Sequence, residues 1–311
     1  MIVHLSAPAV DFLKRVEVRL QQLRPKKRIA FPEGDDPRVI QAAMRLAAGD
    51  LLEPILICRK KDTPADGLRR HFPECDPATQ KYADYYLKRR AHRGATARDA
   101  QEAARRPLDF AALMVATGDA DGFLGGAANS TAITVRAALH AIGAQKGVKT
   151  VSSFFVLCTP NEQAGCRGLF IAADCAVVID PTPNELADIA LMAAGSAHMA
   201  FECEAVVGLL PASDPERTEQ AARIVRSRAP QLEVRTGEDS IYRANAIVFP
   251  DLNSANIVYK MVEWLGGASA FGPMLQGMNK PANDLSRAAT VDDIYVTGMI
   301  TALQAHSEVG S

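Results

Sequence analysis

Apolar residues recur every three or four positions in several stretches of the chain, which is the spacing of one face of an α-helix. This spacing predicts helices at residues 9–23, 37–47, 131–142, 184–201, 215–228, 254–265 and 290–306. Asp36 and Pro37 mark one helix start, because acidic residues are favoured at the positive end of a helix and proline in its first turn. Gly266-Gly267 marks the end of another helix, since glycine commonly terminates helices.

Short apolar runs alternate with these helices and predict buried strands. They lie at residues 28–31, 54–58, 110–115, 151–157, 169–172, 176–179, 204–210 and 246–250. Strands that alternate with helices usually pair in parallel. The pattern therefore predicts an α/β protein with mostly parallel sheets, and it leaves the order of the strands open.

Composition narrows the class of protein. The 311 residues suffice for two domains or one large α/β unit, and 48% hydrophobic with 23% charged residues is ordinary for a folded soluble protein. Thirty-five basic residues against 36 acidic ones leave almost no net charge. The chain therefore has no overall positive potential to attract nucleic acid or an anionic membrane, and both are poor candidates as partners. Long apolar runs such as 189–201 are too short to span a bilayer.

The cysteines and the amino-terminal stretch indicate a cytoplasmic protein. Six cysteines show no CxxC pairing, which in a chain of this size favours reduced thiols over a disulfide framework and argues against zinc. The six histidines share no spacing, so we expect no metal site. Lys14, Arg15 and Arg19 are mixed with apolar residues, which is not the layout of a secretion signal.

The stretch at residues 279–287, followed by Asp293, carries the strongest chemical signal. It combines Lys280, Asn283, Ser286 and Arg287 in one short segment, a mixture that no hydrophobic core requires. An arginine offers a planar set of donors to phosphate oxygens, and a nearby carboxylate can serve as a base. We therefore expect this segment to hold an anionic group and to move a proton, with Lys280 and Asn283 among the substrate-binding residues.

A glycine-rich stretch at residues 118–131 comes after the predicted strand at 110–115 and leads into a predicted helix. Such a layout is a natural anion cradle, and Ser130 or Thr131 would cap the helix, with Arg136 one to two turns in. An ordinary loop with an ordinary cap remains the alternative. The stretch matches neither the nucleotide pattern GxxxxGK[ST] nor the dinucleotide pattern GxGxxG.

A basic cluster at residues 85–94 stands out in an otherwise balanced chain. Runs of this kind usually form a solvated helix face. The alternative is that one arginine of the cluster turns inward to a phosphate or to the nucleotide of coenzyme A.

Taken together, these stretches resemble the phosphate acetyltransferases, also called phosphotransacetylases. The resemblance is carried by residues 28–38, 118–136, 147–153 and 244–287 and covers most of residues 28–305. It implies two α/β domains of the isocitrate/isopropylmalate-dehydrogenase-like class, with mostly parallel sheets and the active site in the interdomain cleft. The first domain would be discontinuous, with residues 1–143 plus 288–311, and the second would span 144–287.

The resemblance also implies the reaction and the residues that perform it. Acetyl-CoA and phosphate would be interconverted with acetyl phosphate and CoA, without an acyl-enzyme, a bound cofactor or a metal. Asp293 matches the base that takes the proton of the CoA thiol, and Ser286 would position or stabilise that thiol. Arg287 would be the third catalytic residue and, with Arg136, would hold the acyl phosphate and the developing oxyanion. The remaining matches would bind substrate: Ser130 and Thr131 the phosphate, and Arg90 (or, as the alternative, Arg89) a more remote group. A homodimer is implied in the same way.

The chain departs from the family pattern at three places. Asn129 and Ile133 stand where the family usually has His and Asp, and residues 211–215 replace a Ser- and Lys-containing glycine loop. The span 230–244 is shorter than usual, with 237–239 as a remnant. The Ser286, Arg287 and Asp293 set predicts an active transferase, whereas the departures leave open a catalytically impaired module that senses CoA or acyl phosphate. A dehydrogenase of the same fold class would need a carboxylate cluster for a metal, which the sequence lacks.

Overall fold

The computed structural model describes residues 5–61, 67–211 and 214–307. The chain separates into two compact units. The first unit comprises Val16–Gln145 and Met278–Ser311, and the second comprises Met1–Arg15 and Lys146–Gly277. This division differs from the expected one at three places, because residues 1–15 group with the second unit, and residues 144–145 and 278–287 with the first.

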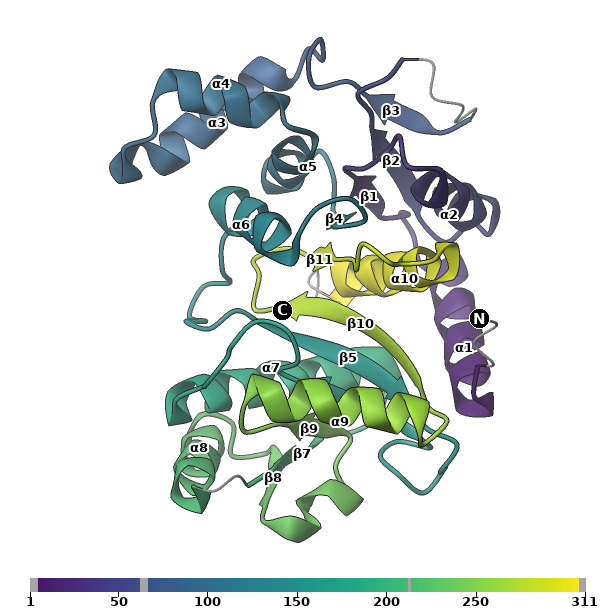
Figure 1. Ribbon diagram of the computed structural model, residues 1–311, viewed down its shortest axis with the longest axis vertical. Coiled ribbons are helices and arrows are strands. Elements are labelled where there is room, and N and C mark those ends of the chain that lie inside the picture. Colours follow the sequence, from purple (N-terminus) through teal and green to yellow (C-terminus); the bar gives the residue numbers. More distant parts are fainter. Residues whose placement is uncertain (1–4, 62–66, 212–213, 308–311) are drawn as a thin grey trace. The chain divides into compact units, whose positions relative to one another are not determined.

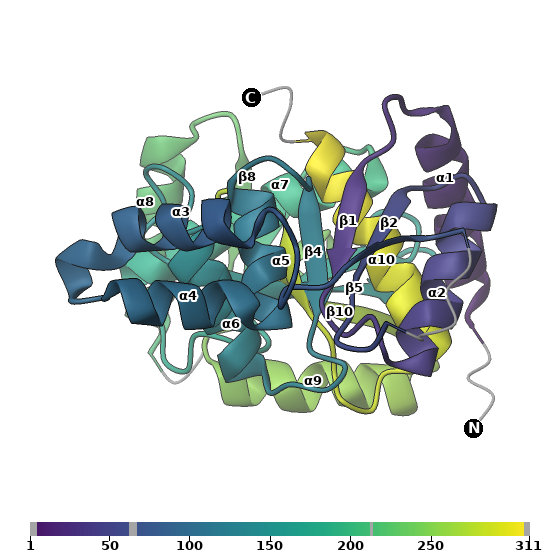
Figure 2. The same cartoon turned by 90° about the horizontal axis from the view of Figure 1, so that it is seen from above.

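The first unit is built on a parallel sheet in the order β11-β4-β1-β2-β3. Its strands are β1 Arg28–Phe31, β2 Glu53–Ile57, β3 Arg69–His71, β4 Gly122–Gly125 and β11 Ala282–Asp284. Its helices are α2 Pro37–Ala48, α3 Thr79–Arg90, α4 Ala97–Arg105, α5 Pro107–Ala116, α6 Thr131–Ala141 and α10 Val291–Ser307, with a short 3-10 turn, η1 Ala91–Arg93. In Figure 2, α2 and α10 lie on one side of the strands and α5 on the other, so the sheet is covered on both faces.

The second unit holds a mixed sheet in the order β10-β5-β6-β9-β7-β8 (Figure 1). Its strands are β5 Ser152–Cys158, β6 Leu169–Ala173, β7 Val206–Leu209, β8 Glu233–Thr236, β9 Ala246–Val248 and β10 Ser269–Gln276. The β5 strand is antiparallel to both β10 and β6, and the other pairs are parallel. Its helices are α7 Pro183–Phe201, α8 Pro215–Arg228 and α9 Leu252–Trp264, with the turn η2 Glu238–Tyr242, while α1 Ala7–Gln22 begins in this unit.

The prediction of an α/β protein with mostly parallel sheets is confirmed. The helical periodicity located α1, α2, α6, α7, α8, α9 and α10 to within a few residues. Asp36 caps α2 by accepting the N–H of Arg38, and Pro37 follows it in the first turn, as expected. Among the residues that the structure describes, no helix has both the length and the apolar character needed to cross a membrane.

The predicted strand at residues 110–115 is wrong, because these residues lie in α5. Helix α5 is buried from Phe110 to Val115, and a helix buried all round shows no amphipathic spacing. The strand lies instead within the glycine-rich stretch, as β4. A Cβ atom on Gly125 would come within 2.7 Å of Pro32 and 2.8 Å of Leu108, so this strand needs glycine for close packing.

The predicted strand at residues 176–179 is also wrong, since the segment is irregular. The Asp174 carboxylate accepts the backbone N–H groups of Ala176 at 3.0 Å and Val178 at 2.7 Å. These bonds satisfy donors that a strand would have offered to a neighbouring strand.

Two departures from the family pattern fall in the second unit. Within 211–215, Ala212 and Ser213 lie outside the described residues, and Asp214 caps α8 by accepting the N–H of Arg217. The shortened span 230–244 holds β8, which pairs in parallel with β7, followed by η2.

Candidate active site

The motif at residues 279–287 enters β11 and leaves it at the carboxyl end. Asn283 pairs with Leu124 of β4, and the N–H of Leu285 donates to the carbonyl of Gly125 at 2.7 Å, which extends the pairing past the strand. The next two residues, Ser286 and Arg287, are exposed. Ligands of open parallel sheets usually bind outside the carboxyl ends of the strands. Both side chains therefore lie at the edge where such a site is expected.

Asp293 is exposed on the first turn of α10 and belongs to a capping box. Its Oδ2 atom accepts the N–H and the hydroxyl of Thr290, each at 2.8 Å, while its own N–H donates to the Thr290 hydroxyl at 3.2 Å. This reciprocal arrangement satisfies donors at the helix start and fixes the orientation of the carboxylate. Asp293 thus has a structural task in addition to any chemical one.

Arg38 joins the loop after β11 to the loop after β4. From α2 its guanidinium donates to the carbonyls of Arg287 at 2.9 Å, Ala289 at 2.8 Å and Ala127 at 3.0 Å, and it pairs with Asp36 at 2.7 Å. The side-chain hydrogen bond to Arg38 is the main reason that the pKa of Asp36 is lowered. One side chain therefore holds the two loops that the sequence singled out.

The loop after β4 turns sharply at Gly126. This residue has a φ of 109°, and a Cβ atom there would lie 2.3 Å from Asp284 Oδ1. Only glycine fits such a close approach at a positive φ. The turn brings the chain to Ser130, which occupies the N-cap position of α6.

The start of α6 is open to solvent. Ser130 makes no side-chain capping hydrogen bond, and Ser130 and Thr131 are both exposed. The prediction that one of them occupies the cap position is confirmed for Ser130, but its hydroxyl does not cap the helix. Exposed N–H groups and hydroxyls at a helix N-terminus favour an anion.

Two carboxyl groups flank Gly126, that of half-buried Glu33 and that of buried Asp284. Glu33 Oε1 accepts the N–H of Gly126 at 2.9 Å and the Asn129 amide at 2.6 Å, whereas Glu33 Oε2 and Asp284 Oδ1 are buried without a partner among the described residues. Burial raises the pKa of both groups, and the charge of Asp284 adds to the rise at Glu33. The hydroxyls of Thr131 and Thr134 act in the opposite direction on Asp284. Both carboxyl groups therefore hold a proton more tightly than they would in water.

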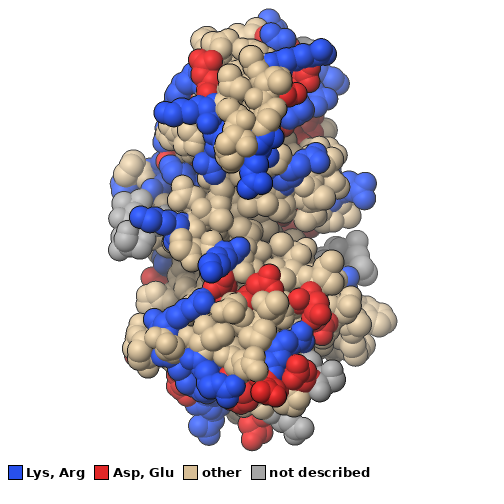
Figure 3. Space-filling model, turned by 90° about the vertical axis from the view of Figure 1, so that its left-hand side faces the viewer, with Lys and Arg blue, Asp and Glu red and all other residues tan. Residues whose placement is uncertain are grey.

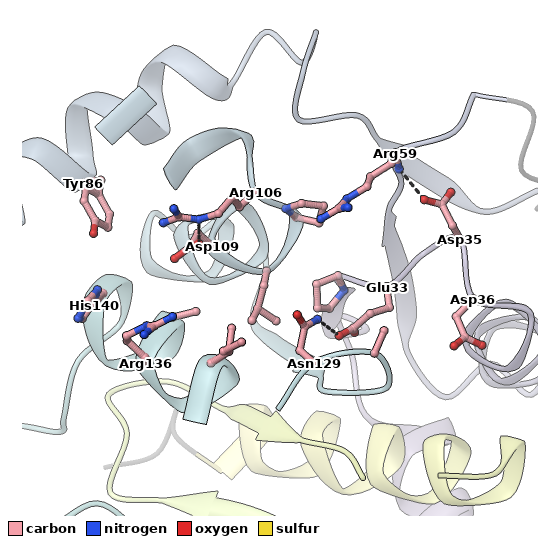
Figure 4. A pocket seen from close by; sticks show the side chains of 16 residues that line it. Glu33, Asp35, Asp36, Arg59, Tyr86, Arg106, Asp109, Asn129, Arg136 and His140 are labelled. Atoms are coloured by element: carbon pink, nitrogen blue, oxygen red, sulfur yellow. Dashed lines mark hydrogen bonds and ion pairs between the residues drawn. The ribbon is translucent and has the colours of Figure 1, made fainter. Parts of the chain in front are cut away.

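A cavity of about 920 Å³ opens beside this loop within the first unit (Figure 4). Glu33 and Asn129 lie at one part of the cavity wall and Arg136 and His140 of α6 at another. The residues that line it are Pro32, Glu33, Asp35, Asp36, Arg59, Tyr86, Arg106, Pro107, Leu108, Asp109, Ala128, Asn129, Ile133, Arg136, Ala137 and His140. Desolvation, followed by the charge of Arg90, lowers the pKa of His140, so the imidazole favours its neutral form.

Two smaller hollows adjoin this cavity through Arg106, which lines all three. One of them, of about 310 Å³, is also lined by Arg90 and Arg93, at the turn between α3 and α4. Figure 3 shows many lysine and arginine side chains on the first unit, in the upper part of the view. Arg106 itself is held by Asp109 at 2.6 Å.

The structure distinguishes the two candidate arginines of α3. Arg89 donates to the carbonyls of His140 at 3.0 Å and Ile142 at 3.1 Å, which closes the last turn of α6. Arg90 contacts the His140 ring at 3.3 Å and lines the smaller hollow. Arg89 is therefore used by the fold, and Arg90 is the one that faces a hollow.

Asn283 and Lys280 have different surroundings. Asn283 is fully buried, and its amide donates to Thr301 at 2.8 Å and Gln304 at 2.7 Å of α10. These bonds attach β11 to α10, so we do not retain Asn283 as a substrate-binding residue. Lys280 is half-buried just before β11.

Asn129 and Ile133, the two departures near α6, both line the cavity, and Ile133 is 41% exposed. Sequence reasoning missed Arg38, Glu33 and Arg106. The signal available for Arg38 and Glu33 was the charged run after β1, at residues 33–38. Within the described ranges, no group of three or more His, Cys, Asp or Glu residues could hold a metal ion.

The chain resembles known transferases over almost its whole length. It matches the family described as phosphate acetyl/butaryl transferase at residues 11–238 and 239–302. A phosphate acetyltransferase from Paracoccus denitrificans is 42% identical over 305 residues, covering 89% of this chain and 95% of the relative. One from Acetivibrio thermocellus is 33% identical over 329 residues, covering 95% and 98%.

Solved structures agree with the sequence relatives. A phosphotransacetylase from Streptococcus pyogenes superposes with a TM-score of 0.85 at 32% identity, covering 94% of this chain and 98% of the other. A branched-chain phosphotransacylase from Enterococcus faecalis shares the fold, with a TM-score of 0.67 at 18% identity. The chain therefore belongs to the phosphate acetyl/butaryl transferase family and is an enzyme of the phosphate acetyltransferase class.

Proposed function

We propose that this enzyme interconverts acetyl-CoA and phosphate with acetyl phosphate and CoA by direct attack of the CoA thiolate. The observation that supports this most is the arrangement at the end of β11. Exposed Ser286 and Arg287 precede the exposed carboxylate of Asp293, and Arg38 ties their loop to the loop that leads to Ser130. The groups that would activate the CoA thiol and those that would bind the phosphate thus lie on neighbouring loops of one unit.

Asp293 acts as the base in this proposal. A free thiol has a pKa near 8.5, so CoA is mostly protonated at neutral pH and needs a base before it can attack. The proton of the thiol passes to Asp293, the sulfur bonds to the acyl carbon, and the bond to phosphate breaks. Both capping bonds that the Asp293 carboxylate accepts go to Oδ2, and in this proposal Oδ1 receives the proton. Ser286 positions the thiol.

Cationic and N–H donors stabilise the departing phosphate. Arg287 and Arg136 are both exposed, one beside β11 and the other on α6, and Ser130 and Thr131 present the open helix start. Donors aimed at developing negative charge are the usual source of stabilisation in acyl transfer. Arg90, with Lys280 as a further contact, binds the phosphates of CoA, which is a substrate and not a resident cofactor.

We further propose a homodimer that acts in the cytoplasm. The α9 helix exposes apolar side chains on one face, with Ile257 60%, Met261 51% and Trp264 83% exposed. A continuous apolar face of this kind favours a second copy of the chain. Light scattering of the parent protein should give the mass of a dimer. Trp264→Glu should lower this mass toward that of a monomer, whereas the matched change Met44→Glu on α2 should leave it unchanged. A monomer mass for the parent protein would contradict the proposed dimer.

Thioester formation from acetyl phosphate and CoA tests the activity, with propionyl and butyryl phosphates run beside it. Turnover should be lost in Arg287→Ala and retained in the matched control Arg98→Ala, whose side chain is solvent-exposed on α4. If the parent protein forms no thioester while CoA still binds in calorimetry, the chain is a binding module and the proposal fails.

A further inference from the structure

The loop after β4 makes a tight turn before it reaches α6. The N–H of Asn129 donates to the carbonyl of Gly126 at 3.3 Å, which closes a turn over residues 126–129. Ser130 follows directly, and its carbonyl accepts the N–H of Ile133 at 2.9 Å at the start of α6. The conformation of this turn therefore sets where the open start of the helix lies.

Glu33 holds both ends of the turn. It follows β1, which pairs in parallel with β4, so both segments leave the sheet at its carboxyl edge. One oxygen, Oε1, accepts the N–H of Gly126 at 2.9 Å and the side-chain amide of Asn129 at 2.6 Å. Figure 4 shows the bond to Asn129 in the cavity wall. A single acceptor that joins the first and last residues of a turn opposes its opening.

The residues after β11 restrain the same turn from another side. A Cβ atom on Gly126 would lie 2.3 Å from Asp284 Oδ1 and 2.6 Å from the carbonyl oxygen of Leu285. This packing limits the movement of the Gly126 end, whereas Glu33 also reaches the Asn129 end, next to Ser130. The position of the helix start thus depends on the bonds that Glu33 accepts.

We propose that Glu33 is a positioning residue for phosphate binding. By joining Gly126 to Asn129, it holds Ser130 and Thr131 in the arrangement that binds the phosphate group. Glu33 acts through the turn and does not itself contact phosphate. The inference rests on the proposed function, which assigns the exposed start of α6 to the phosphate.

Loss of the two bonds should weaken phosphate binding more than it slows the chemical step. In Glu33→Ala, the KM for phosphate should rise at least about tenfold, whereas kcat should stay within about threefold. Glu33→Gln keeps an oxygen acceptor of the same reach, so its KM should stay within about threefold of the parent value. Asn129→Ala removes one bond and should raise KM by a smaller factor, but in the Glu33→Ala background it should add nothing.

Asp121→Ala is the matched control, because Asp121 joins the same two strands at their opposite ends. Asp121 directly precedes β4, and its carboxylate accepts the backbone N–H of Arg28, the first residue of β1, at 2.8 Å and its guanidinium at 2.9 Å. Asp121→Ala should lower the melting temperature, as Glu33→Ala does, and leave the KM for phosphate unchanged. An equal rise in KM in both variants would show that general loss of stability explains the effect, which would overturn the proposal.

The test uses the full chain and two measurements. The rate of acetyl phosphate formation from acetyl-CoA is followed against phosphate concentration, and the affinity for inorganic phosphate is measured by calorimetry. Unchanged KM and affinity in Glu33→Ala, or a KM in Glu33→Gln as high as in Glu33→Ala, would overturn the positioning role. If Glu33→Ala does not fold, an unchanged phosphate affinity in Asn129→Ala would overturn it.

The two measurements also separate this inference from the proposed function. A parent protein that binds phosphate but forms no acetyl phosphate refutes the proposed transfer, and the phosphate affinities of the variants then decide the role of Glu33. An active parent protein whose KM and phosphate affinity do not respond to Glu33→Ala refutes the positioning role alone. A parent protein that binds no phosphate would overturn the inference.

Discussion

Thr290→Ala and Asp293→Asn separate the two tasks of one carboxylate. In the folded protein, Asp293 Oδ2 caps α10 through Thr290, and the same carboxylate is the proposed base. Thr290→Ala removes two of the three capping-box hydrogen bonds and leaves the carboxylate present. Asp293→Asn keeps an oxygen that can accept from Thr290, but it cannot take a proton from a thiol.

The magnitudes of the two effects differ enough to be told apart. Loss of a helix cap costs about 1 kcal/mol, which lowers the melting temperature of a unit of this size by about 2–4 °C. Loss of a general base costs about 10²–10⁴-fold in rate, or about 3–5 kcal/mol in the barrier. Thr290→Ala should therefore lose stability and keep kcat within about threefold. Asp293→Asn should lose little stability and at least about 100-fold in kcat.

The assay combines thermal unfolding with the rate of thioester formation from acetyl phosphate and CoA. Asp292→Asn is the matched control, because Asp292 is the exposed carboxylate next to Asp293 in sequence. Within the described part of the chain, its one ion pair is with Arg45 on the surface, at 2.6 Å. Equal turnover in Asp293→Asn and Asp292→Asn would remove Asp293 as the base. An equal loss of turnover in Thr290→Ala would show that the carboxylate acts through the helix start alone.

Three further predictions follow from the loops around Gly126. Arg38→Ala should lower kcat/KM at least about tenfold and lower the free energy of unfolding by about 1–3 kcal/mol, because the carbonyls of Ala127, Arg287 and Ala289 lose a charged donor. Arg45→Ala is the control, and equal effects in the two variants would refute the bridging role. Gly126→Ala should lower the free energy of unfolding in urea by more than about 2 kcal/mol, since its Cβ would overlap Asp284. Gly118 also has a positive φ, of 84°, but a Cβ there would meet no atom within 4 Å, so Gly118→Ala should cost only about 1 kcal/mol. Similar costs in the two variants would contradict the packing argument. Burial raises the pKa of Glu33, so the folded state holds its proton more tightly than the unfolded state does. The free energy of unfolding should therefore fall as pH rises from about 4.3 through the raised pKa, and Glu33→Gln should make this fall shallower in urea titrations. An unchanged pH dependence in Glu33→Gln would refute the raised pKa of Glu33.

Much of the fold could be predicted because amphipathic helices and buried strands leave periodic patterns. The capped starts of α2 and α7 and the helical spacing of α8 are local features that a short window contains. The fully buried α5 shows no amphipathic period, so it resembles a strand. The β4 strand begins and ends with a glycine, because residues distant in sequence pack too closely there for a side chain. A local sequence pattern does not contain this information.

The strand β10 was missed for a related reason. It contains Gly272-Pro273, which reads as a turn, and the structure places a register shift between Phe271 and Met274 on this edge strand. Proline is tolerated at such bulges and edges. The sequence could not show that an edge position was available.

The candidate site residues could be named from the sequence by their type, whereas the contacts that hold them could not. Ser286, Arg287 and Asp293 stand out by residue type, and the structure leaves all three exposed near the end of β11. Arg38 could not be assigned a role, because its partners are backbone carbonyls about two hundred and fifty positions away. Asn283 was misplaced because a buried amide and a substrate-binding amide look alike in sequence, and only its bonds to α10 distinguish them.

The measurement that tests direct thiolate attack most sharply is exchange of labelled phosphate into acetyl phosphate. If CoA attacks the acyl carbon directly, the label should enter acetyl phosphate only when CoA is present, and the exchange should fall at least about 100-fold in Asp293→Asn. Rapid exchange without CoA would reveal an acyl-enzyme and would contradict the account.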